Sequence, residues 1–108
     1  MSSDPRHALQ RQVDALAAEG LHPAGAFELE FFLLANERSP EGKMIPARDV
    51  LDGRRNSKTD VYSVDQLHGM LPLFNDIYAD AAKAGIKAET LISEFAPGQY
   101  ELTLHYRE

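Results

Sequence analysis

The chain has 108 residues, which is enough for one small domain, and its 44% hydrophobic and 26% charged residues are typical of a folded globular protein. A formal net charge of −6 argues against nucleic-acid binding, and the absence of cysteine excludes disulfides, thiolate zinc sites and a cysteine nucleophile. No apolar run approaches the ~20 residues that a membrane span requires. We therefore expect one cytoplasmic domain over residues 1–108 that binds neither nucleic acid nor membranes.

The first part of the chain predicts a helix followed by a strand. Asp4 can cap a helix over residues 4–20, Pro5 suits its first turn, and Gly20 suits the left-handed position after its end. The apolar stripe of this helix consists of Leu9, Val13, Leu16 and Ala17. The next segment, 24–35 (AGAFELEFFLLA), is typical of a strand.

Alternation along this strand places two glutamates on the same face. One face carries Phe27, Leu29, Phe31 and Leu33, and the other carries Ala26, Glu28, Glu30, Phe32 and Leu34. The simplest interpretation of Glu28 and Glu30 is a solvated face of an antiparallel sheet. Against it, two apolar residues continue that face, and neighbouring carboxylates repel each other unless a cation or a base compensates them. Both interpretations stay open at this point.

A long connection follows the strand. Residues 36–43 (NERSPEGK) predict a turn-rich segment, and residues 44–47 (MIPA) predict a short returning strand. Residues 48–60 are polar and show no periodicity, so we expect a mobile loop there.

A second helix is predicted over residues 63–85. Ser63 can cap it, with Gln66 completing a capping box, and Pro72 should kink or split it because proline lacks a backbone donor. The expected buried stripe consists of Leu67, Met70, Phe74, Ile77, Tyr78 and Ala81.

Two apolar segments, 86–93 and 99–106, predict an antiparallel hairpin around a Pro-Gly turn. The order of elements favours an α+β fold, with a mostly antiparallel sheet and two helices packed on one face. The hairpin would bring Glu94 and Glu101 near each other. If the 24–35 strand lies beside it, four carboxylates converge on one surface, which suits a hard divalent cation. Solvent-facing hairpin ends are the alternative.

The two acidic stretches together resemble a known family. ELEFFL is similar to the Glu-x-Glu-Phe strand of the glutamine synthetase family, and ISEFAPGQYEL is similar to its Glu…Pro-Gly-Gln-x-Glu hairpin. The intervening and leading segments also fit in order and spacing. The resemblance covers essentially the entire chain and implies the amino-terminal part of a glutamine synthetase-like catalytic domain, closest in character to the γ-glutamylpolyamine synthetase branch.

The resemblance implies roles for individual residues. It assigns Glu30, Glu94 and Glu101 to a first Mg²⁺ or Mn²⁺ near the glutamyl substrate, and Glu28 to a second metal that bridges the nucleotide phosphates. Glu89 matches a position that contacts ATP. Gly98 and Gln99 lie in the turn that sets the geometry between the two hairpin glutamates.

The implied reaction is an ATP-dependent ligation of glutamate to ammonia or an amine through γ-glutamyl phosphate, in which metal ions neutralise moving negative charge. The family's later metal-binding histidine, final metal glutamate and phosphate-binding arginines have no counterpart in this sequence. We therefore expect a segment that is inactive alone. A non-catalytic metal-binding or regulatory module is the alternative, and an exposed sheet edge predicts self-association.

Overall fold

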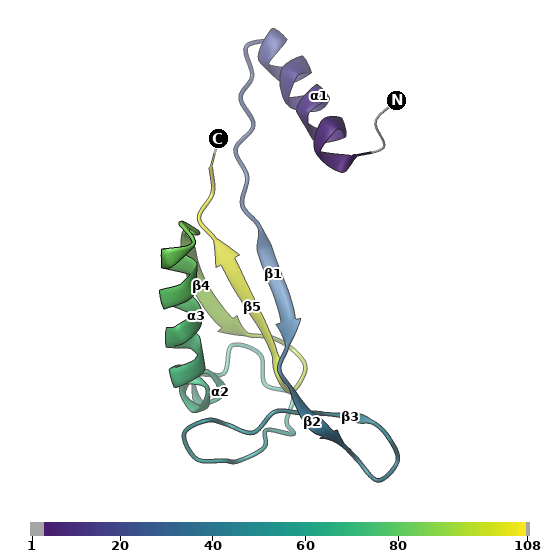
Figure 1. The fold of residues 1–108 in the computed structure, drawn as a ribbon, viewed down its shortest axis with the longest axis vertical. Helices are drawn as coiled ribbons and strands as arrows, with labels where there is room; N and C mark the ends of the chain where they lie inside the picture. Colours follow the sequence, from purple (N-terminus) through teal and green to yellow (C-terminus); the bar gives the residue numbers. More distant parts are fainter. Residues whose placement is uncertain (1–3, 108) are drawn as a thin grey trace.

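The fold is known from a computed structural model that describes residues 4–107, so the outermost positions of the expected 1–108 domain lie outside the described residues. In chain order the elements are α1 (Pro5–Ala18), β1 (Glu28–Phe32), β2 (Leu34–Arg38), β3 (Met44–Pro46), α2 (Val64–Gly69), α3 (Leu71–Lys83), β4 (Ala88–Ser93) and β5 (Gln99–Leu104). Figure 1 shows their arrangement.

The main sheet is antiparallel and has the strand order β1-β5-β4, with β5 in the centre. The strands β2 and β3 form a separate two-stranded hairpin beyond one end of this sheet (Figure 1). Both α2 and α3 pack against β4. The predicted α+β class, with an antiparallel sheet and two helices on one face, is confirmed.

The two packed helices are the halves of the segment expected as one helix. The 63–85 segment divides at Met70, and Pro72 lies in the first turn of α3. Backbone N–H groups of the first turn have no acceptor within the helix, so the missing N–H of proline costs no helical hydrogen bond there. The predicted first helix also forms. Asp4 caps it by accepting a hydrogen bond from the Arg6 amide at 2.9 Å, but no residue of α1 is buried. This helix therefore contributes nothing to the core.

The strand expected over residues 24–35 is shorter and ends at Phe32, because Leu33 leaves the main sheet. The Leu33 amide donates to the Gly98 carbonyl at 2.8 Å, and the Leu33 carbonyl accepts from the Ala47 amide at 2.9 Å. The chain then continues as β2 to Arg38, so the prediction of a turn was wrong for residues 36–38. The short strand expected after it is confirmed as β3.

The start of α2 follows the capping prediction only in part. The Ser63 hydroxyl accepts from the Gln66 amide at 3.5 Å, as expected. However, the Gln66 side chain donates to the Asp60 carbonyl at 3.3 Å, and the Ser63 amide donates to the Ser93 hydroxyl at 2.6 Å. The reciprocal bond of a capping box is replaced by contacts with the loop and with β4.

The loop before α2 contains neither helix nor strand but follows a defined path. Arg48 and Arg55 form an isolated antiparallel bridge, and the Asp49 amide donates to the Arg54 carbonyl at 2.7 Å. An ion pair joins Arg55 to Glu37, and this hydrogen bond lowers the pKa of the Glu37 carboxyl. The loop is thereby fastened to β2.

The core is small and lies between β5 and the helices α2 and α3. Its buried cluster consists of Met70, Phe74 and Tyr100, with the rings of the last two in an edge-to-face contact at 4.9 Å. Burial, with a contribution from the charge of Asp49, raises the pKa of the Tyr100 hydroxyl to about 12, so this group stays neutral at physiological pH.

The chain is more extended than a compact domain of the same length. Its radius of gyration is 18.4 Å, whereas a compact domain of this size has about 13 Å. Figure 1 shows the reason, since α1 stands apart from the sheet at the end of an extended segment. None of the helices in residues 4–107 has the length and apolar character needed to cross a bilayer.

We expect Phe74→Ala to lower the free energy of unfolding by about 3 kcal/mol or more, because it opens a cavity in a core with few other large side chains. Urea denaturation followed by circular dichroism measures the change. The matched control is Val64→Ala in α2, whose side chain is 75% exposed and which should change stability by less than about 0.5 kcal/mol. Equal effects of the two substitutions would contradict this description of the core.

Candidate metal centre

Two glutamates from distant parts of the chain lie directly opposite each other in the main sheet. In the antiparallel register of β1 and β5, Glu30 pairs with Glu101 and Glu28 pairs with Thr103. Directly paired side chains project from the same face, with Cβ atoms ~5 Å apart. The neighbouring residues Tyr100 and Leu102 point to the opposite face and are buried. We call the surface that carries Glu28, Glu30 and Glu101 the acidic face.

Glu94 lies at the edge of the acidic face, immediately after β4. Its amide donates to the Gln99 carbonyl at 2.8 Å, so Glu94 is opposite Gln99 and diagonal to Glu101. The preceding residue, Ser93, pairs with the buried Tyr100 and shares its face, which leaves Glu94 on the acidic side by alternation. The expected proximity of Glu94 and Glu101 is therefore that of diagonal neighbours.

Gln99 connects the hairpin turn to β1 and was assigned only a turn role from the sequence. Its side-chain amide donates to the Glu30 carboxylate at 2.8 Å, and its side-chain oxygen accepts from the Ala96 amide at 3.1 Å. On the same face, the Thr103 hydroxyl donates to the Glu101 carboxylate at 3.2 Å. Two of the predicted metal ligands are thus oriented by neutral donors of the protein.

The hairpin turn requires glycine at position 98. The φ angle of Gly98 is +79°, and a Cβ atom there would lie 2.8 Å from the Leu33 carbonyl oxygen and 3.1 Å from Cβ of Pro46. The Gly98 carbonyl accepts the Leu33 hydrogen bond described above. This close backbone approach fixes the hairpin that carries Gln99 against the end of β1.

Ser93 fastens the end of β4 to the start of α2. It is fully buried, its carbonyl accepts from the Tyr62 amide at 2.9 Å, and its hydroxyl exchanges hydrogen bonds with the Ser63 backbone. Tyr62 adopts a φ of +58°, which is rare and strained for a residue with a side chain. These contacts hold the residue before Glu94 in place, and nothing in the sequence pattern indicated them.

Glu89, the predicted ATP contact, lies at the far end of β4 from Glu94. The register shifts there, since Ala88 pairs with Leu104 while Thr90 pairs with Thr103, so Glu89 is the extra residue of a β-bulge. A bulge redirects a side chain out of the regular alternation. Glu89 is exposed and lies outside the regular alternation that places the other predicted residues on the acidic face.

The donors of the acidic face fit a hard divalent cation, because all of them are carboxylate oxygens. Within residues 4–107, the ion pairs are Arg54–Asp52, Arg55–Glu37 and Lys83–Asp80, so no basic side chain neutralises the predicted ligands. In the same described range, no three acidic or histidine side chains are close enough together to enclose a metal ion. The predicted ligands therefore have the oxygen donors that a hard divalent cation prefers and lie on one face of the sheet, but they do not enclose a metal site.

Comparison with known proteins bears on what this face does. Residues 2–108 match the family described as "Glutamine synthetase, catalytic domain". The chain belongs to this family. The glutamine synthetase resemblance of the two acidic motifs is thereby confirmed, and the α+β fold is that of a segment of its catalytic domain.

Two relatives illustrate the relationship. The chain is 37% identical over 105 residues to "Gamma-glutamylputrescine synthetase PuuA" of Escherichia coli (strain K12), covering 97% of this chain and 22% of that protein. It is 29% identical over 108 residues to "Type-1 glutamine synthetase 1" of Dictyostelium discoideum, covering 96% of this chain and 21% of that protein. The chain spans about a fifth of the length of these curated relatives.

We expect Gly98→Ala to destabilise this glutamine synthetase segment by more than the cost of a positive φ alone, because the new Cβ also meets the Leu33 carbonyl. Gly42→Ala is the matched control, since Gly42 has a similar φ of +78° but an added Cβ there would meet no atom within 4 Å. The control should cost about 1 kcal/mol, and Gly98→Ala clearly more, in urea denaturation. Equal costs would mean that the approach of the turn to Leu33 does not constrain the hairpin.

Proposed function

We propose that this chain is part of an ATP-dependent ligase that joins the γ-carboxylate of glutamate to ammonia or an amine. The observation that carries the proposal is the register of β1 and β5, which sets Glu30 opposite Glu101 with Glu28 on the same face. Membership of the glutamine synthetase catalytic-domain family supports this chemistry.

The proposed ligands of a first Mg²⁺ or Mn²⁺ are Glu30, Glu94 and Glu101, and Glu28 is the proposed ligand of a second. A bound divalent cation supplies positive charge that offsets the negative charge of phosphate and carboxylate groups during transfer. The protein's part is to hold the carboxylates on a rigid sheet. Three of them lie on β1 and β5, and the fourth lies at the hairpin that joins β4 to β5.

Two further residues are proposed to contribute to the site. Gln99 positions Glu30 by donating to its carboxylate at 2.8 Å, and this bond also orients the hairpin relative to β1. Glu89 is proposed to contact ATP. Its place at a β-bulge supports the proposal, because bulges often re-aim side chains beside active sites.

The amine that we propose as the second substrate is a polyamine, with diamines included in that class. The relative named for putrescine shares 37% identity with this chain, whereas the relative named as a glutamine synthetase shares 29%. We also propose a cytoplasmic location and self-association, both expected from the sequence.

We expect no turnover by the 108-residue chain alone, because the resemblance assigns phosphate-binding arginines and a metal-binding histidine to positions that this sequence lacks. The measurement is release of phosphate from ATP in the presence of glutamate and putrescine. Amine-dependent γ-glutamyl transfer by the purified chain would contradict the expectation.

Calorimetric titration of Mn²⁺ into the chain tests the metal site directly. We expect saturable binding that Glu94→Gln/Glu101→Gln abolishes, because the double change removes ligands from both strands of the hairpin. The matched control is Glu19→Gln/Glu41→Gln, which removes the same two charges away from the acidic face and should leave binding unchanged.

Two outcomes of this titration would count against the proposal. If both double variants bind Mn²⁺ as the unmodified chain does, the cation occupies another position. If the unmodified chain shows no saturable binding, the carboxylates of this chain do not form a metal site on their own.

A further inference from the structure

Ser93 is a polar residue at a position where packing of the sheet favours an apolar one. It pairs with Tyr100 and shares the core face of β4 with Leu91, which packs against the buried cluster. None of its surface is exposed. A buried hydroxyl gives up its hydrogen bonds to water and adds little apolar contact, so an apolar side chain would serve the core better. The core alone therefore does not account for serine at this position.

The polar atoms of Ser93 hold the chain that leads into α2. The hydroxyl accepts a hydrogen bond from the Ser63 amide at 2.6 Å and donates one to the Ser63 carbonyl at 3.3 Å. The Ser93 carbonyl accepts from the Tyr62 amide at 2.9 Å. We call these three bonds the Ser93 junction. They join the end of β4 to residues about 30 positions earlier in the chain.

The Ser93 junction holds Tyr62 in an unfavourable backbone conformation. Its φ of +58° is the one positive value at a residue other than glycine within residues 4–107. The Tyr62 side chain is 67% exposed, so packing of its ring does not offset the cost of this conformation. Strained residues persist where surrounding contacts hold them, and such residues cluster at functional sites. The strain at Tyr62 therefore directs attention to the residues beside the junction.

The residue that follows the junction is Glu94. Strand β4 ends at Ser93, so Glu94 is the first residue beyond the strand. Its amide donates to the Gln99 carbonyl at 2.8 Å, and its carboxylate accepts from the neighbouring Phe95 amide at 3.3 Å. Both of these bonds are local to the hairpin. The Ser93 junction ties this part of the backbone to the start of α2, so the direction of the Glu94 side chain depends on it.

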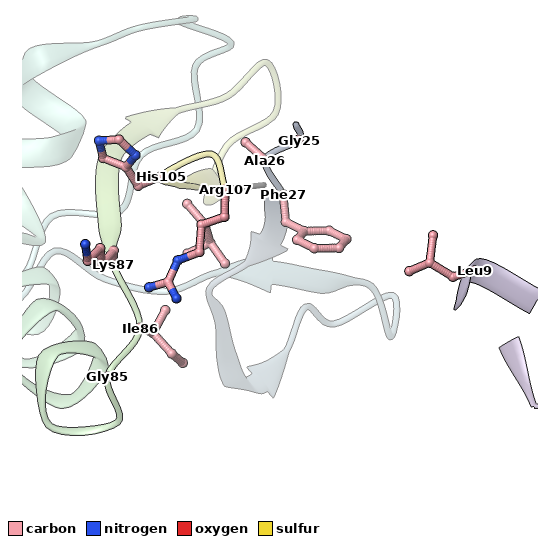
Figure 2. Close-up of a pocket in the computed structure, with 10 residues that line it drawn as sticks. Leu9, Gly25, Ala26, Phe27, Gly85, Ile86, Lys87, His105 and Arg107 are labelled. Carbon is pink, nitrogen blue, oxygen red and sulfur yellow. The ribbon is translucent and has the colours of Figure 1, made fainter. Parts of the chain in front are cut away.

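The junction lies at the end of the β4–β5 hairpin that carries Glu94. An open cavity of about 520 Å³ lies at the other end, where its lining includes Ile86, Lys87 and His105 (Figure 2). None of the four predicted glutamate ligands lines that cavity. A buried hydroxyl and a left-handed tyrosine, two departures from ordinary local rules, therefore occur together beside a predicted ligand and not beside the cavity.

We propose that Ser93 is a positioning residue for Glu94, and that the junction fixes the direction of the Glu94 carboxylate relative to Glu101. This inference rests on the proposed function, in which Glu94 is a ligand of the first cation. The other two proposed ligands of that cation accept hydrogen bonds from side-chain donors on β5. Glu94 is instead oriented through its backbone. Ser93 does not touch the cation and acts only through the residue that follows it.

Hydrogen exchange of backbone amides, followed by NMR without metal, tests the junction first. Ser93→Ala removes both hydroxyl bonds, and we expect the amides of Tyr62 and Glu94 to lose protection by about tenfold or more relative to the amides of β5. The matched control is Ser63→Ala. It removes the side-chain cap of α2 but keeps the backbone amide and carbonyl that bond to Ser93, so both amides should stay protected.

Calorimetric titration of Mn²⁺ into the same variants then tests the effect on the site. We expect Ser93→Ala to weaken binding about 10- to 100-fold, the range typical of changes to residues that orient metal ligands. Ser63→Ala should bind as the unmodified chain does. A merely structural serine would lower stability in both variants and change the Mn²⁺ affinity in neither. If Ser93→Ala does not fold, Ser93→Ala/Tyr62→Gly replaces it, with Ser63→Ala/Tyr62→Gly as control, because glycine adopts a positive φ without strain.

Two results would overturn the proposal. One is equal protection of the Tyr62 and Glu94 amides in the two serine variants, and the other is an Mn²⁺ affinity that Ser93→Ala leaves unchanged or that both variants lower equally. Absence of Mn²⁺ binding by the unmodified chain is a different result, because it contradicts the proposed metal site itself. The exchange comparison, which needs no metal, then still decides whether Ser93 holds Glu94 in place.

Discussion

The antiparallel pairing of β1 with β5 is the constraint on which both the core and the candidate site depend. Along β5, Tyr100 and Leu102 point toward the helices, and Glu101 points to the acidic face. Because side chains alternate strictly, packing Phe74 against Tyr100 fixes the side on which Glu101 emerges. A slip of one residue in this register would bury the carboxylate and expose the tyrosine. The core therefore determines the position of the proposed ligands.

This arrangement has an electrostatic cost. Like charges directly opposite each other in a sheet destabilise it, and Glu30 faces Glu101 with a further carboxylate two residues away. The side chains of Gln99 and Thr103 offset part of that cost by donating hydrogen bonds. A divalent cation would offset more of it. Packing of the core thus fixes the strand register of the site, whereas the charges of its carboxylates do not stabilise the core.

Features that depend on local periodicity could be predicted from the sequence, and features that depend on distant contacts could not. The shared face of Glu28 and Glu30 follows from alternation, and the division of the second helix follows from Pro72. The bond from Gln99 to Glu30 joins residues 69 positions apart, so no local pattern encodes it. The end of the first strand at Phe32 likewise depends on the distant Gly98 carbonyl. The stripe of α1 predicted the helix correctly but carried no information about its standing apart from the sheet.

We propose that carboxylates from β1, β5 and the hairpin bind one cation. The most direct measurement is paramagnetic broadening of backbone amide resonances by substoichiometric Mn²⁺. If one cation binds there, the signals of Glu30, Glu94 and Glu101 and their immediate neighbours broaden first and together. Broadening centred on the acidic residues of the 48–60 loop, or spread evenly over the surface, would contradict it.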